Sequence, residues 1–161
     1  MQVPTKTPPW DPNDKESSLE QYASWLNAIA RGAFLQDGHH FEMFFFVTET
    51  GELLGCQFRD GLPREKRNAV IHQQASEIKP FGTIQIIITK IYHPKLTSHP
   101  KSKGLRFVGA SSPDSDELER DCLIVRMLSN AGKDKIWANP ILQYGDHPVL
   151  GNMFETYPAN D

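Results

Sequence analysis

Cysteine is scarce in this chain: its 161 residues include only two, Cys56 and Cys122. Two cysteines cannot form the disulfide framework of a small secreted protein, and both lie in apolar runs that are typical of strands. Free cysteines in such runs usually behave as small buried apolar side chains. The sequence therefore predicts a reducing, cytoplasmic location, although a single disulfide between the two stays open at this point.

Long hydrophobic runs and a strong charge excess are also missing. No stretch approaches the roughly 18 consecutive apolar residues that a membrane-spanning helix needs, and residues 1–16 have no apolar centre of the kind found in signal peptides. The formal net charge of −3 argues against binding to the phosphate backbone of nucleic acids. With 39% hydrophobic and 23% charged residues, the composition predicts one soluble domain with no membrane partner.

Motifs of several catalytic classes are absent from the sequence. It contains no G-x-S-x-G nucleophile elbow, no G-x-x-x-x-G-K phosphate loop and no G-x-G-x-x-G dinucleotide motif. Acidic residues directly before Cys122 favour its protonated thiol over the reactive thiolate. The sequence therefore favours a protein without a nucleophilic mechanism, and it predicts no cofactor.

Two segments have apolar residues at the spacing of an amphipathic helix. The first is expected to begin at Ser17, which has capping-box spacing with Glu20, and to stop at Gly32. The second is expected to follow Pro63 and to end near Pro80. Its apolar positions are predicted to form a buried stripe: Val70, Ile71, Ala75 and Ile78.

Five segments are predicted to be strands, on the basis of β-branched and aromatic residues between turn signals. They are residues 41–47, 53–58, 83–92 and the two halves of 121–144. The sequence TETGE between the first two indicates a hairpin loop in which Gly51 supplies a positive φ. A second turn is expected near residues 130–134.

The order of these elements predicts the fold class. Helix, strand, strand, helix, strand, strand, strand indicates one α+β domain, with a mostly antiparallel five-stranded sheet and both helices packed on it. The domain is expected to span 17–144, between a proline-rich N-terminal arm at 1–16 and a C-terminal tail at 145–161. The order is similar to that of roadblock and profilin-like domains, and the resemblance implies a role in protein interaction or ligand sensing.

Both termini carry large apolar residues outside the predicted domain. Trp10 stands in the arm, which holds four prolines, and Phe154 stands in the tail. The arm is either a disordered leader or a segment that docks through Trp10, because an isolated exposed tryptophan is costly. Terminal arms add contact area outside a folded core. We therefore predict Trp10 and Phe154 as interaction residues, with a protein partner or self-association into an oligomer.

The sequence GHHFEMFFFV, residues 38–47, raises the alternative of a metal site. In a strand, His40 and Glu42 share one face and His39 points to the other. Polar residues at the open end of a buried strand explain the same stretch. Zinc needs three or four ligands, so further ones must come from elsewhere in the chain. The candidates are His93, His99, Asp114, Asp116 and His147.

The order of these residues is similar to that of the JAMM metalloproteases. In that family a glutamate on an early strand is followed by histidine with proline after a later strand, and then by Ser-x-x-Asp. The matching residues here are Glu42, His93-Pro94 or His99-Pro100, Ser111 and Asp114. The resemblance implies that Glu42 is the general base for a zinc-bound water. The two family histidines stand one residue apart, whereas His93 and His99 are six apart in this chain.

Three functions are therefore open from the sequence. The favoured one is a non-catalytic assembly or adaptor domain that acts through protein surfaces and terminal arms. A small metal-dependent hydrolase is the first alternative. The second is a ligand-sensing module with a pocket between sheet and helices, lined by Phe46, Tyr92 and Trp137.

Overall fold

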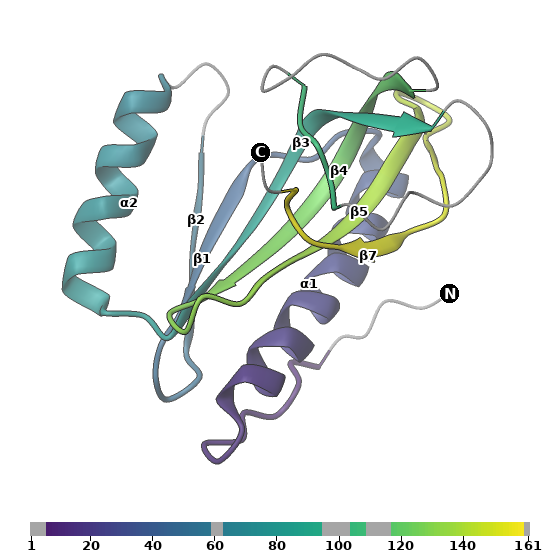
Figure 1. The fold of residues 1–161 in the computed structure, drawn as a ribbon. Coiled ribbons are helices and arrows are strands. Elements are labelled where there is room, and N and C mark those ends of the chain that lie inside the picture. The colour runs from purple at the N-terminus through teal and green to yellow at the C-terminus, as the bar shows by residue number, and fades with distance from the viewer. Residues whose placement is uncertain (1–5, 59–62, 95–103, 109–116, 160–161) are drawn as a thin grey trace.

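A computed structural model describes residues 6–58, 63–94, 104–108 and 117–159. An antiparallel sheet has the strand order β2-β1-β3-β4-β5-β6, and β7 also pairs with β5 (Figure 1). The elements are α1 (Lys15–Asp37), β1 (Met43–Val47), β2 (Leu53–Gln57), α2 (Arg64–Ile78), β3 (Gly82–Pro94), β4 (Glu117–Ser129), β5 (Asp134–Gln143), β6 (Val149–Leu150) and β7 (Phe154–Thr156). The predicted α+β class and element order are confirmed. The sheet has seven strands rather than five, because the tail adds β6 and β7.

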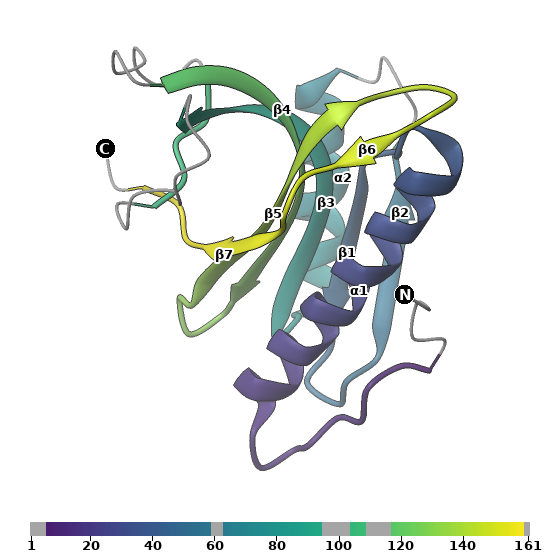
Figure 2. The same ribbon diagram turned by 90° about the vertical axis from the view of Figure 1, so that its right-hand side faces the viewer.

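Helix α1 lies along one face of the sheet, and the main hydrophobic core forms between them (Figure 2). Every second residue of the central strands points to this face. Ala23 and Ala30 are fully buried, and their small side chains allow the helix to approach the sheet closely. The large residues of this core are Leu19, Tyr22, Leu26, Phe34, Phe45, Ile84, Val125, Met127 and Trp137.

Helix α1 extends beyond both predicted ends. Its N-cap is Asp14 rather than Ser17, because the Asp14 carboxylate accepts a hydrogen bond from the Ser17 backbone N–H at 3.3 Å. Gly32 lies inside the helix, which ends instead at Gly38 with a φ of +70°. A glycine inside a helix costs about 1 kcal/mol, and the complete burial of Phe34 beyond it offsets that cost.

Glu20 does not form the predicted capping box but joins α1 to the β4–β5 hairpin. Its Oε2 accepts a hydrogen bond from Nζ of Lys133 at 2.8 Å, and its Oε1 accepts one from Nζ of Lys135. Lys135 also pairs with Glu155 of β7, with 2.8 Å between Nζ and Oε1. The hydrogen bonds from Lys133 and Lys135 hold the pKa of the Glu20 carboxyl below its usual value.

The Glu20 network leads to a pH-dependent effect on stability. Glu20→Gln is expected to lower the free energy of unfolding at neutral pH by about 1 kcal/mol. Because the folded-state pKa is lowered, the carboxylate stabilises the fold above its unfolded-state pKa, and this contribution is lost as the pH falls through the folded-state value. Urea unfolding at several pH values should show the difference between wild type and variant shrinking as the pH falls below the ordinary glutamate pKa of about 4.3. A difference that stays constant with pH would contradict the assignment.

The second face of the sheet is covered, over β3 to β5, by the chain's own later segments. A smaller buried cluster forms there from Ile91, Leu105, Cys122, Ile124, Ile136 and Ala138. The Leu105 N–H donates to the Tyr157 carbonyl at 2.7 Å, and the Ala159 N–H donates to the Leu105 carbonyl at 2.9 Å. These bonds hold residues 104–108 and the end of the chain together over this cluster.

Cys122 is a free, buried cysteine in this second cluster, so the disulfide left open by the sequence is not formed. Burial is the main cause that raises the pKa of its thiol well above the usual value. A buried, protonated thiol is unreactive. Its place among apolar neighbours confirms its prediction as a small apolar side chain.

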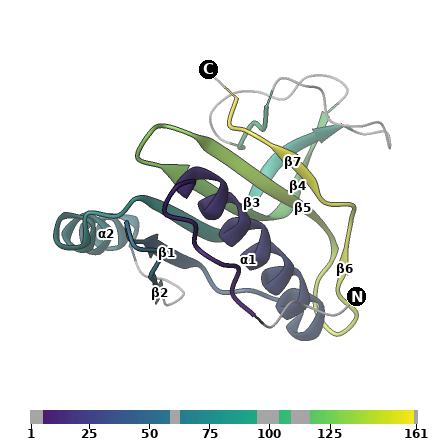
Figure 3. The same ribbon diagram turned by 90° about the horizontal axis from the view of Figure 1, so that it is seen from below.

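Helix α2 stands on the β2 side of the sheet, away from α1 (Figures 1 and 3). It begins after Pro63 as predicted and ends at Lys79, which has a φ of +51°. The predicted burial of its apolar stripe is wrong, because α2 has no buried residue. Val70 is 39% exposed, and Ile71, Ala75 and Ile78 are half-buried. In the described part of the chain, no helix is both long and apolar enough to cross a membrane.

Candidate functional site: a groove beneath helix α2

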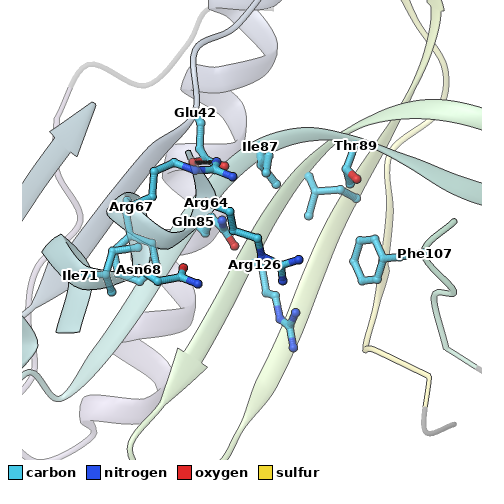
Figure 4. Close-up of a pocket in the computed structure, with 12 residues that line it drawn as sticks. Glu42, Arg64, Arg67, Asn68, Ile71, Gln85, Ile87, Thr89, Phe107 and Arg126 are labelled. Atoms are coloured by element: carbon cyan, nitrogen blue, oxygen red, sulfur yellow. Dashed lines mark hydrogen bonds and ion pairs between the residues drawn. The ribbon is translucent and has the colours of Figure 1, made fainter. Parts of the chain in front are cut away.

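A groove of about 600 Å³ lies between α2 and the second face of the sheet (Figure 4). Helix α2 supplies one wall, through side chains that lie on the same side of successive turns. The sheet supplies the floor, through alternate residues of β3 and β4 and the beginning of β1. The lining residues are Glu42, Phe44, Arg64, Arg67, Asn68, Ile71, Gln85, Ile87, Thr89, Phe107, Ile124 and Arg126.

The groove combines an apolar floor with basic and amide groups. Phe44, Ile87 and Ile124 offer apolar surface, and Asn68 and Gln85 offer donors and acceptors. Its lining holds three arginines and one carboxylate, a formal excess of +2 (3 − 1), whereas the whole chain has a net charge of −3. The groove is therefore a basic region on an acidic protein.

Arg126 on the groove floor is held by Asp134 of the neighbouring strand. Its Nε lies 3.0 Å from Oδ1 and its Nη2 lies 2.7 Å from Oδ2 of Asp134, which is a bidentate pair. The pair fixes the Arg126 guanidinium and neutralises most of its charge. Arg64, at the start of α2, is exposed and forms no ion pair with any residue in the described ranges. The two arginines thus differ in how readily they can bind an incoming anion.

Glu42, one residue before β1, forms an ion pair with Arg67 of α2. Nη1 of Arg67 donates to Oε2 of Glu42, and the side chains are only 28% and 14% exposed, respectively (Figure 4). The Nε of Arg67 is buried and finds no hydrogen-bond partner among the described residues. An unpaired buried donor costs about 1–3 kcal/mol. The Glu42 carboxylate is therefore paired with Arg67, while the Nε–H of Arg67 has no acceptor among the described residues.

A smaller hollow of about 400 Å³ adjoins the same ion pair. It brings Glu42 near His39, His40 and Tyr144. The Nδ1 of His40 lies 2.7 Å from the carbonyl oxygen of Phe41. Within the ranges that the structure describes, no three histidine, cysteine, aspartate or glutamate side chains gather in a way that could hold a metal ion.

The other predicted metal ligands are only partly covered by the structure. His93 lies near the end of β3, with its ring 6.0 Å from the ring of Phe154 between centroids. His147 is exposed in the turn between β5 and β6. His99 and Asp114 lie outside the described residues, as do Ser111 and Asp116. The metal site, with Glu42 as its base, therefore stays a prediction.

The predicted interaction residues pack on the fold of their own chain. The Trp10 ring lies 5.4 Å from the ring of Tyr22 and 5.8 Å from that of Phe81, measured between centroids. Phe154 of β7 is half-buried against the second cluster. A role for Trp10 and Phe154 in binding a partner stays a prediction.

The aromatic residues predicted to line a ligand pocket are core residues. Phe46 and Trp137 are each 1% exposed, and Tyr92 is 7% exposed. None of the three lines the groove beneath α2. The groove instead uses Phe44, which lies two residues before Phe46 on the same face of β1.

Sequence reasoning missed the α2 residues that form the groove wall. Arg64, Arg67, Asn68 and Ile71 follow one another at intervals of three, one and three positions, so they lie on one side of the helix. This spacing was a signal for a mixed basic and apolar helix face. It did not reveal whether that face packs on the sheet or stands open.

The chain matches no known protein family, and comparisons with curated proteins and with solved structures also found no match.

Proposed function

We propose that this protein is a non-catalytic binding module that takes up a segment of a partner protein in the groove beneath α2. The observation that carries the proposal is the position of α2, a helix of 15 residues without a buried residue above a groove with an apolar floor. Helices of this length are marginal in isolation, and most helical stability in proteins comes from packing of an apolar face. A bound segment would supply the packing that α2 lacks.

The lining of the groove suits a peptide segment. Apolar side chains of such a segment can pack against Phe44 and Ile87, and its backbone amides can hydrogen-bond to Asn68, Gln85 and Thr89.

The groove volume also lies in the range of small-molecule sites, so the ligand-sensing alternative would use the same surface. The contact with Arg67 supports binding over catalysis there, because the Glu42 carboxylate already accepts a hydrogen bond from a side chain of its own chain. The buried free thiol of Cys122 suits a reducing cytoplasm.

Selection of a random displayed peptide library on the full chain tests this proposal. The recovered peptides are expected to bind the wild type and to lose about 10-fold or more in affinity for Ile71→Gln, because Ile71 lines the groove. Val70→Gln is the matched control, since Val70 is the neighbouring β-branched residue on α2 and does not line the groove.

Both variants are expected to keep the free energy of unfolding within about 1 kcal/mol of wild type, because neither side chain is buried. Circular dichroism during urea unfolding checks this. Peptides that bind wild type, Ile71→Gln and Val70→Gln equally would place the binding surface elsewhere. Failure to recover any specific peptide would also count against the proposal.

A further inference from the structure

We infer that the bound segment is acidic, and that one of its carboxylates competes with Glu42 for Arg67. This inference rests on the proposed function and adds the chemistry of the partner. In the unbound protein Glu42 occupies the position of the partner's carboxylate, and it keeps Arg67 oriented toward the groove.

The charge distribution of the groove gives the first support. Arg64 and Arg67 are three residues apart on α2, so their guanidinium groups lie on the same side of successive turns. Arg126 faces them from β4 but is already paired with Asp134. The charge available for a ligand is therefore concentrated at the α2 wall.

The hydrogen bonding of Arg67 gives the second support. A guanidinium binds a carboxylate best through two parallel N–H donors. Glu42 accepts from Nη1 of Arg67 alone, and the Nε of Arg67 is buried without a partner in the described part of the chain. A carboxylate from a bound segment can satisfy this donor, and the exposed Arg64 lies beside it.

The apolar floor decides between a protein segment and a free anion. Phe44, Ile71 and Ile87 lie in the same groove as the arginines. A free phosphate would leave these side chains in water, whereas a segment with aspartate or glutamate next to aliphatic or aromatic residues covers them. The chemistry that fits the groove is therefore an acidic, partly apolar peptide.

Two synthetic peptides test this inference: acetyl-SDEFLIEDS-amide and its neutral counterpart acetyl-SNQFLIQNS-amide. Each is titrated into the full-length, nitrogen-15-labelled protein, and backbone amide shifts are followed by NMR. The acidic peptide is expected to shift the amides of Asn68, Ile71 and Ile87 and to bind about 10-fold more tightly than the neutral one. Inorganic phosphate is titrated as a third probe.

Three variants distinguish pairing of the peptide carboxylate with Arg67 from a general effect of positive charge on α2. Glu42→Gln removes the internal competitor, so it is expected to tighten binding of the acidic peptide about fivefold and to leave the neutral peptide unchanged. Arg67→Gln is expected to abolish the difference between the two peptides. Lys66→Gln is the control, because it makes the same charge change at the adjacent α2 position, outside the groove lining.

Several results would overturn the inference. Equal affinities for the two peptides, or a loss on Lys66→Gln as large as on Arg67→Gln, would show that no carboxylate is recognised at Arg67. Displacement of the acidic peptide by an equal concentration of phosphate would assign the site to a free anion. The inference also fails if neither synthetic peptide shifts the groove amides. Neutral peptides recovered from the library that still depend on Ile71 would leave the proposed function standing while this inference fails.

Discussion

Trp137→Ala is expected to lower the free energy of unfolding by about 3–5 kcal/mol. Trp137 is 1% exposed on β5 and packs in the core between the sheet and α1. It is paired with Val125 of β4 on one side and with Glu155 of β7 on the other, so its backbone joins three strands while its side chain is in the core. Removing it leaves a cavity that these strands cannot close without breaking their pairing.

Urea unfolding followed by circular dichroism measures this effect without using the tryptophan signal. Leu142→Ala is the matched control, because Leu142 is on the same strand but is 53% exposed. Its expected cost is within about 0.5 kcal/mol. Similar losses for the two variants would contradict the placement of the core on the α1 face.

Asn139→Ala is expected to cost about 3 kcal/mol through a buried polar network. Asn139 is fully buried, and its Nδ2 donates to Oδ1 of Asn27 at 2.8 Å and to the carbonyl of Leu123 at 2.9 Å. Its Oδ1 accepts from Nη1 of Arg31 at 2.8 Å. The truncation removes one partner from each of these three groups, and Arg31 keeps only a long contact of 3.5 Å from Nη1 to the Gly151 carbonyl. Burial around Arg31 also lowers its pKa by desolvation.

A double-mutant cycle with Asn27→Ala identifies the network as the cause. Because Asn27 and Asn139 share one hydrogen bond, the double variant should be about 1–2 kcal/mol more stable than the sum of the single effects predicts. Asn27 is on α1 and Asn139 is on β5, so this coupling reports the docking of helix on sheet. Strictly additive effects would mean that the two amides do not interact in the folded protein.

The strands and turns were predictable because their signals are local. The alternation predicted for residues 41–47 is confirmed within β1, which begins at Met43: Phe44 lines the groove and Phe45 lies in the core on the α1 face. The hairpin at Gly51 also forms, with a φ of +87°. Strands β6 and β7 have two and three residues, which is too few for a periodic pattern.

The two helices show where local patterns stop being informative. Both have apolar residues at helical spacing, yet only α1 is buried. The α1 face includes Phe34, with Ala23 and Ala30 to allow close approach to the sheet. The α2 face mixes Ile71 with arginines, so its periodicity suits either an intramolecular or an intermolecular contact.

The ion pair at the groove could not be predicted in detail from the sequence. Its partners, Glu42 and Arg67, are 25 residues apart and meet only because α2 returns over β1. The sequence left Glu42 as either a polar residue at the open end of a buried strand or the base of a metal site. The contact with Arg67 is consistent with the first, while the predicted ligands His99 and Asp114 lie outside the described residues.

The most direct test of the binding function is the affinity of a library-selected peptide for wild type, Ile71→Gln and Val70→Gln, measured by isothermal titration calorimetry. A groove beneath α2 that binds the peptide predicts about 10-fold or greater weakening for Ile71→Gln and a change within about twofold for Val70→Gln. Equal affinities for all three proteins would contradict the assignment of the groove as the binding site.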